Sequence, residues 1–275
     1  MQSTLTFRGH EVVVVEEALP TRKGDSDPDT TGRLVWECSS LFLKWLSSDD
    51  HFAQLCGSPS TPFSDACILD LSSGAGLVPL ALCKGGVSKV LSWETASQLR
   101  HLRANTAGTP IHTSVYYWGE DPAPLLAECG TPTLTCALCS DVLYIALRDG
   151  LHRHLSVTLR ALTRHLQKEG AILFGFEERL IREEGEFMHS LTLPLEPWVG
   201  DSESPSGEEG VSVAVSGFAA LGALPIKVVE LPVGDTQLTR EDTLQRKGVG
   251  EEGGEGAANL DIFWEPPPIR LFLLS

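Results

Sequence analysis

No long apolar run occurs in this sequence. Its apolar stretches fall short of the roughly 18 consecutive residues that a membrane-spanning helix needs, so we expect no transmembrane segment. Residues 1–17 alternate apolar and polar side chains, without the basic head and apolar block of a secretory signal. The 7 cysteines are an odd number scattered through apolar segments, which is typical of reduced thiols rather than of a disulfide framework. These absences favour a cytoplasmic protein, for which the nucleus stays open as an additional compartment.

Positive charge is also scarce. The 21 Lys and Arg residues against 37 Asp and Glu residues give a formal net charge of −16, which argues against non-specific binding to nucleic acid. Much of the acid lies in the last third of the chain, in a Gly-, Glu- and Ser-rich tract that we delimit as residues 199–256. Two interpretations of this tract stay open. It is either a solvated, flexible insertion or a docking surface for a basic protein.

Several catalytic and metal-binding patterns are missing as well. Cys136 and Cys139 form a lone C-x-x-C inside an apolar segment, with no second pair at metal spacing, so we expect no metal site. Ser72 and Ser73 are not surrounded by a Gly-x-Ser-x-Gly elbow, which argues against a serine nucleophile. The sequence shows no internal repeat, and its 275 residues suffice for one large α/β domain.

Short apolar segments alternate with helical patterns over most of the chain. Residues 5–7 and 12–15 predict a β-hairpin within residues 4–17, and apolar spacing predicts a helix over residues 33–48. Five apolar segments are predicted as strands: residues 67–71, 87–93, 111–118, 134–139 and 171–176. Helices are predicted between them: residues 77–83, residues 96–105, a short one after residue 118, and a long one with Asp149 as N-cap and Gly170 at its end.

This alternation predicts the architecture. Strands that are apolar on both faces and connected by helices indicate a doubly wound, mostly parallel, Rossmann-like α/β sheet. Residues 225–231, 260–264 and 269–274 are candidates for closing strands at the sheet edge. We expect a single domain over residues 1–275, with residues 33–191 as a ligand-binding core and the acidic tract as an insertion.

Polar and aromatic residues follow the predicted strands where ligands bind in open parallel sheets. The first strand ends at Asp70 and a small-residue loop that contains Ser72, Gly74 and Gly76. Glu94 follows the second strand about 20 residues later, where an acid can bind both ribose hydroxyls. The third strand leads to Trp118, and the fourth to Ser140, Asp141 and Tyr144. Each signal alone has a structural explanation, since a Gly-x-Gly turn serves packing, Trp118 can be core, and Asp141 can cap a helix.

The loop does not match the full Gly-x-Gly-x-x-Gly of pyrophosphate binders, because position 72 is Ser and position 79 is Pro. An NAD-linked oxidoreductase is therefore disfavoured. A nucleoside without phosphates needs an acid for its ribose, an aromatic ring for its base and groups for its tail. S-adenosylmethionine fits that description, and its sulfonium suits acidic, aromatic surroundings.

Five motifs, taken in chain order, resemble a known family. They are Thr31-Gly32-Arg33-Leu34-Val35-Trp36-Glu37, the segment 68–80, Tyr117-Trp118-Gly119, Asp141-Val142-Leu143-Tyr144 and Phe176-Glu177-Glu178-Arg179. The set is similar to the seven-strand protein-lysine methyltransferases called methyltransferase family 16, which methylate non-histone proteins. The resemblance covers roughly residues 31–191.

The resemblance implies roles for individual residues. The residues implied to bind the cofactor are Trp36, Asp70, Ser72, Gly74, Gly76, Glu94, Trp118 and Ser140. Asp141 and Tyr144 match the acidic-x-x-aromatic motif beside the target lysine, and Glu177 and Arg179 match a motif that is structural or shapes the substrate channel. The family usually has Glu-Leu-Gly where this chain has Asp70-Leu71-Ser72. The extra Cβ at position 72 narrows the backbone approach, so we expect weaker cofactor binding or a displaced loop.

The sequence therefore predicts a monomeric S-adenosylmethionine-dependent methyltransferase that acts on the lysine ε-amine of a non-histone protein. In the mechanism we expect, Asp141 orients the amine, Tyr144 forms a wall of the lysine channel, and water takes the proton. No nucleic-acid or membrane partner is expected. Two alternatives stay open: a catalytically degenerate member that acts as a protein-binding module, and a methyltransferase with a small-molecule substrate.

Overall fold

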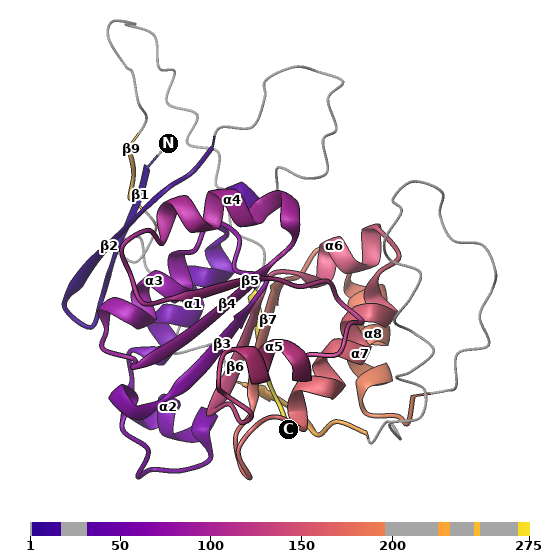
Figure 1. Cartoon of the computed structure of the whole chain (residues 1–275). Helices are drawn as coiled ribbons and strands as arrows, with labels where there is room; N and C mark the ends of the chain where they lie inside the picture. Colours follow the sequence, from indigo (N-terminus) through magenta and orange to yellow (C-terminus); the bar gives the residue numbers. More distant parts are fainter. Residues whose placement is uncertain (1, 18–31, 196–224, 232–244, 248–268) are drawn as a thin grey trace, which may run out of the picture.

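A seven-stranded sheet forms the centre of the protein. We describe a computed structural model over residues 2–17, 32–195, 225–231, 245–247 and 269–275. The strand order is β5 (His112–Val115), β4 (Lys89–Glu94), β3 (Cys67–Leu71), β6 (Cys136–Ser140), β7 (Ile172–Glu177), β10 (Ile269–Leu274) and β8 (Val228–Leu231). All of these strands except β10 run parallel, and β10 pairs antiparallel with β7 and β8 (Figure 1). This order confirms the predicted doubly wound, Rossmann-like sheet.

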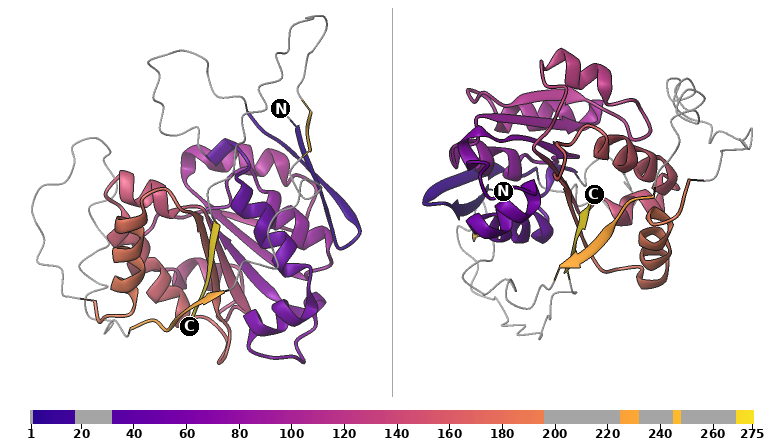
Figure 2. Two further views of the ribbon diagram at one scale, coloured as in Figure 1. Left: turned by 180° about the vertical axis from the view of Figure 1, so that it is seen from behind. Right: turned by 90° about the horizontal axis from the view of Figure 1, so that it is seen from below.

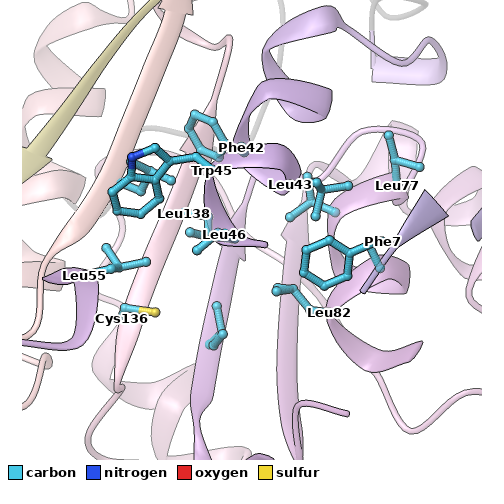
Figure 3. Packing of buried hydrophobic residues seen from close by; sticks show 14 of the residues in the cluster. Phe7, Phe42, Leu43, Trp45, Leu46, Leu55, Leu77, Leu82, Cys136 and Leu138 are labelled. Atoms are coloured by element: carbon cyan, nitrogen blue, oxygen red, sulfur yellow. The ribbon is translucent and has the colours of Figure 1, made fainter. Parts of the chain in front are cut away.

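Helices cover both faces of the sheet (Figure 2). Alternate strand residues separate the core into two clusters: Ile68 of β3 lies in one and its neighbour Leu69 in the other. The first cluster includes side chains of α1 (Glu37–Leu46), α2 (Asp49–Cys56) and α3 (Leu77–Lys84), and Figure 3 shows part of it. The second includes side chains of α5 (Ala123–Glu128), α6 (Leu143–Arg148), α7 (His152–Thr163) and α8 (Ile181–Leu191). Among the described residues, no helix combines the length and apolarity needed to cross a membrane.

The predicted N-terminal hairpin is present as β1 (Gln2–Phe7) and β2 (His10–Val15). Phe7 belongs to the first core cluster, which binds the hairpin to α3 (Figure 3). A third strand, β9 (Gln245–Lys247), pairs with β1 and was not predicted. Both β9 and β8 lie within the acidic tract. The presence of β8 confirms the closing strand predicted in residues 225–231. Most of residues 199–256, and the strand expected at 260–264, lie outside the described residues.

The helix predicted over residues 33–48 is wrong in extent. Residues 34–36 lead into α1 with Trp36 extended (φ −92°, ψ 148°), because the buried Glu16 carboxylate accepts a hydrogen bond from the backbone N–H of Val35. Ser48 then caps a separate helix, α2, by accepting from the N–H of His51. Gly57 ends α2 at φ 64°, where a Cβ would lie 2.1 Å from the carbonyl oxygen of Glu169.

The boundaries predicted for the long helix are also wrong. Asp149 follows the C-terminus of α6 instead of capping α7, whose N-cap residue is Leu151. The helix ends at Thr163, well before Gly170. The chain turns away there because Leu134 pairs with the segment after α7: its N–H donates to His165 O, and its carbonyl accepts from Gln167 N–H. A tertiary contact therefore terminates α7 before the apolar pattern does.

The remaining elements differ little from their predicted bounds. Strand β3 and helix α4 (Ala96–Asn105) agree with prediction at both ends. Strand β5 is shorter than residues 111–118, so Trp118 lies in the loop that follows it. The consequence for function is that Asp70, Glu94, Trp118 and Ser140 all come at or just after the carboxyl ends of neighbouring strands.

Candidate functional site

A tight loop connects β3 to α3. The N–H groups of Ser72 and Ser73 both donate to the carbonyl of Trp93, at 2.9 and 3.2 Å, which fastens the loop to the end of β4. Gly74 has φ 52°, and a Cβ there would lie 3.0 Å from the carbonyl oxygen of Gly32. Glycine is required at this position both by its backbone conformation and by the segment that covers the loop.

Glu94 joins the end of β4 to this loop. One carboxylate oxygen accepts from the N–H of Gly74 at 2.8 Å, and the other accepts from the N–H of Thr95 at 2.9 Å. The hydroxyl of Thr95 also donates to this second oxygen, at 3.4 Å. The acid predicted to hold a ribose is thus fixed in place by the glycine loop.

Asp70 is a buried acid with incomplete hydrogen bonding. Its side chain lies at the end of β3, and its Oδ2 has no hydrogen-bond partner among the described residues. The pKa of Asp70 is raised to about 7, chiefly by burial, with the Ser73 hydrogen bond opposing the shift and the nearby Glu94 charge adding to it. A buried oxygen of this kind fits a cationic ligand, because a positive charge would favour the ionised form.

Trp118 follows β5 and lies beside the loop that connects β3 to α3. It is half-buried, and its indole N–H donates to the hydroxyl of Ser72 at 3.1 Å. Ser72 itself has φ 63°, a left-handed conformation that is rare outside glycine. The structure thus brings together two residues that the sequence analysis assigned to separate parts of a cofactor pocket.

An acidic and aromatic cage lies at the ends of β6 and β7. We define the cage as Trp36, Asp141, Tyr144 and Glu177, which surround the guanidinium of Arg179. Arg179 pairs with Asp141 Oδ2 at 3.2 Å and also with Glu177. Its Cζ lies 5.0 Å from the centroid of the Trp36 ring and 5.2 Å from that of Tyr144. For Arg179, the family resemblance implied either a structural or a channel-shaping role, and the structure places its guanidinium inside the cage.

The cage holds Asp141 in a defined geometry. Its backbone is left-handed (φ 54°), its side chain is 2% exposed, and Oδ1 accepts from the N–H of Glu177 at 3.1 Å. Burial raises the pKa of Asp141, whereas the Arg179 charge and the Glu177 N–H hold it down. Arg179 therefore helps to keep a buried carboxylate ionised.

The segment 32–36 connects the loop with the cage. The Gly32 carbonyl lies at one end, where it would meet a Cβ at position 74, and Trp36 faces Arg179 at the other. Sequence reasoning placed Trp36 at the cofactor but did not identify Glu16, which anchors this segment through Val35. Ser140 also points toward this side, with its hydroxyl 3.2 Å from that of Ser39 on α1. Within the described part of the chain, no group of three or more potential metal ligands occurs.

Comparisons with known proteins point to one family. A family model described as lysine methyltransferase matches residues 21–193. A curated bovine relative, the protein-lysine N-methyltransferase EEF2KMT of Bos taurus, is 28% identical over 112 residues, which cover 39% of this chain and 30% of that protein. The alignment thus spans less than a third of the relative's length.

Solved structures of S-adenosylmethionine-dependent methyltransferases show distant likeness. One from Clostridium acetobutylicum has a TM-score of 0.35 and 18% identity, covering 49% of this chain and 50% of that one. One from Agrobacterium tumefaciens has a TM-score of 0.41 and 14% identity, covering 68% and 57%. The glycopeptide N-methyltransferase MtfA, complexed with sinefungin, has a TM-score of 0.35 and 17% identity, covering 69% and 64%.

Proposed function

The chain belongs to the lysine methyltransferase family, and from that premise we propose that it methylates the lysine ε-amine of a non-histone protein, with S-adenosylmethionine as methyl donor. The proposal rests on one observation: two complementary sites lie side by side at the carboxyl ends of the strands. The glycine loop with Asp70 and Glu94 suits the cofactor, and the cage suits a cationic side chain. Segment 32–36 borders both.

The residues of the loop fit S-adenosylmethionine. We assign its methionine moiety to Gly74, Gly76 and Asp70, whose unpartnered oxygen favours a cation. We assign its ribose to Glu94 and its adenine to the face of Trp118, with Trp36 and Ser140 as pocket walls. When bound, S-adenosylmethionine supplies a methyl group activated by a sulfonium. The protein's contribution is to align that group with the acceptor and to exclude water.

The cage fits a lysine side chain because it already accommodates a guanidinium between aromatic faces and carboxylates. In this proposal, Asp141 accepts a hydrogen bond from the incoming amine and Tyr144 forms a wall of the channel. A free lysine has a pKa of about 10.4 and is mostly protonated at neutral pH. Desolvation and the sulfonium charge of the bound cofactor would both disfavour the ammonium form, so the amine would lose its proton to water before it reacts.

A second candidate function is a protein-binding module without catalysis. The observation that favours it is the presence of Arg179 inside the cage, since an internal cation competes with a substrate lysine for Asp141. The serine at position 72 favours the same candidate, because it departs from the family's usual glycine. A small-molecule acceptor is a further alternative that the same assay addresses.

Labelled methyl transfer tests the proposal. We expect the full chain, incubated with methyl-labelled S-adenosylmethionine and a protein extract, to yield radioactive methyllysine after acid hydrolysis. Asp141→Asn should lower the rate by about 10²-fold, the order of loss when a positioned polar group is removed from an active site. The matched control is Asp65→Asn, an exposed residue before β3 at the opposite edge of the sheet.

Three other outcomes would contradict the proposal in different ways. Binding of S-adenosylhomocysteine without methyllysine in any extract would favour the binding module. Label recovered only in small molecules would favour the small-molecule acceptor. Full turnover by Asp141→Asn would remove Asp141 from the mechanism while leaving the activity in place.

A further inference from the structure

Ser72 has a strained backbone for which the loop alone gives no reason. Three described non-glycine residues have positive φ: Arg8, Ser72 and Asp141. Arg8 lies in the hairpin turn, and Asp141 holds Arg179 and the Glu177 N–H. A glycine would adopt this backbone conformation without strain. The reason for a serine at position 72 therefore lies in the contacts of its side chain.

The hydroxyl of Ser72 contacts the indole of Trp118. Nε1–H is the only hydrogen-bond donor of an indole ring, and here it donates to Ser72 Oγ at 3.1 Å. The backbone of Ser72 is held in turn, since its N–H donates to Trp93 O at 2.9 Å. The hydroxyl therefore fixes the loop after β5 to the loop after β3, across the end of β4 that lies between them (Figure 1).

We propose that Ser72 is a positioning residue that sets the ring plane of Trp118 for the base of the cofactor. This inference rests on the proposed function, in which Trp118 lies against adenine. Because the indole N–H is already bonded to Ser72, Trp118 offers the base its ring face and no hydrogen bond. Base recognition by Trp118 is then stacking alone, and its strength depends on how well Ser72 orients the ring.

Substitution by glycine separates positioning from a structural role. Ser72→Gly relieves the left-handed strain and keeps the loop conformation accessible. A serine that only maintained the loop would be replaced by glycine with equal or better cofactor affinity. If the serine orients Trp118, the Ser72→Gly protein should keep its thermal stability but bind the cofactor more weakly. Ser72→Ala removes the same hydroxyl and keeps the Cβ.

Calorimetric titration with S-adenosylhomocysteine provides the first test. We expect Ser72→Gly and Ser72→Ala to bind about 3- to 10-fold more weakly than the wild type, as for the loss of one neutral hydrogen bond. Trp118→Phe keeps a ring but has no donor, so adding Ser72→Ala to it should cost less than about 2-fold. Ser60→Ala, an exposed serine before β3, is the matched control and should bind like the wild type.

The indole resonance gives a second readout that needs no cofactor. In a ¹⁵N-labelled sample, Trp118→Phe identifies the Trp118 indole N–H signal by its disappearance. We expect Ser72→Ala to shift that signal and to speed its exchange with solvent, while the other indole signals stay in place.

The outcomes separate this inference from the proposed function. If the wild type binds S-adenosylhomocysteine and both Ser72 variants bind it with the same affinity, the inference is overturned and the proposed function stands. An unshifted Trp118 signal, or an equal loss from Ser72→Ala with and without Trp118, would also overturn it. A wild type that fails to bind S-adenosylhomocysteine would overturn both.

Discussion

Asp70 and Asp141 are both buried carboxyls, but their surroundings differ. Asp141 accepts hydrogen bonds from the Glu177 N–H and from Arg179, and the arginine charge opposes the rise in its pKa. Asp70 has no cationic partner and leaves Oδ2 without a hydrogen bond among the described residues. The protein itself therefore supplies a cationic partner for Asp141, whereas Asp70 would obtain one only from a bound ligand.

The pKa of Asp70 predicts a pH-dependent cofactor affinity. In the free protein the pKa is about 7, and a cationic ligand beside the carboxyl would lower it, so binding releases a proton. Affinity for S-adenosylmethionine should therefore rise as the pH increases from about 6 to 7.5. Calorimetry on the wild type and on Asp70→Asn measures both affinities at each pH. Titration of the ligand affects both proteins equally, so it cancels in the ratio of the two affinities. A ratio that does not change with pH would contradict this assignment.

Removal of Arg179 should change the pH dependence of catalysis. In Arg179→Met, Asp141 loses the charge that opposes the rise in its pKa, so its protonated form persists to higher pH. We expect kcat/KM at pH 7 to fall by about tenfold or more and the acid limb of the profile to move toward higher pH. Arg179→Lys should restore part of the activity. An unchanged profile, or a gain in activity, would mean that Arg179 chiefly obstructs the cage.

The N-terminal hairpin supports the candidate site at the scale of whole elements. Glu16 at the end of β2 is buried and accepts from the Ser3 hydroxyl and the Val35 N–H. The adjacent Glu17 pairs with Arg33 and contacts His101 on α4. These contacts hold segment 32–36 over the glycine loop. The hairpin thereby helps to fix one wall of the site without contributing a side chain to its interior.

Loss of the Glu16 carboxylate should weaken folding and cofactor binding together. Glu16→Ala leaves the Val35 N–H and the Ser3 hydroxyl without this partner, which should lower the free energy of unfolding by about 2 kcal/mol. Urea denaturation measures that change, and calorimetry with S-adenosylhomocysteine should show affinity reduced several-fold. Glu11→Ala, exposed on the same hairpin, is the matched control. Normal affinity in a destabilised Glu16→Ala protein would separate the hairpin from the site.

The elements also show how far sequence could predict this fold. Apolar runs predicted the four inner strands β4, β3, β6 and β7 because a strand buried on both faces leaves a continuous apolar signal. The outer strand β5 is polar and largely exposed, and its predicted bounds were too long. The break between α1 and α2 and the early end of α7 could not be predicted, since Glu16 and Leu134 act on those segments from distant parts of the chain. Strand ends located the candidate site residues. The sequence could not pair Asp141 with Arg179, because that contact depends on how two side chains turn from adjacent strands.

Across the whole molecule, negative charge predominates. The formal net charge of −16 creates a field that attracts a positively charged, lysine-bearing segment and is screened over about 10 Å at 0.1 M salt. We expect the KM for a protein substrate to rise roughly 3- to 10-fold between 50 and 300 mM NaCl. The Kd of S-adenosylhomocysteine should change by less than about 2-fold, because its pocket is partly buried. A KM insensitive to salt would show that local contacts alone select the substrate.

The position of β10 in the sheet has a consequence for synthesis on the ribosome. This strand, Ile269–Leu274, lies between β7 and β8 although nearly a hundred residues separate it from β7 in sequence. Until β10 is synthesised, the backbone groups on one side of β7 have no strand to pair with. Apolar side chains such as Phe174 and Phe176 are then not yet packed against β10. The nascent chain must therefore keep an open sheet edge until residues 269–274 emerge, and this is the interval in which chaperone contact or aggregation competes with completion of the fold.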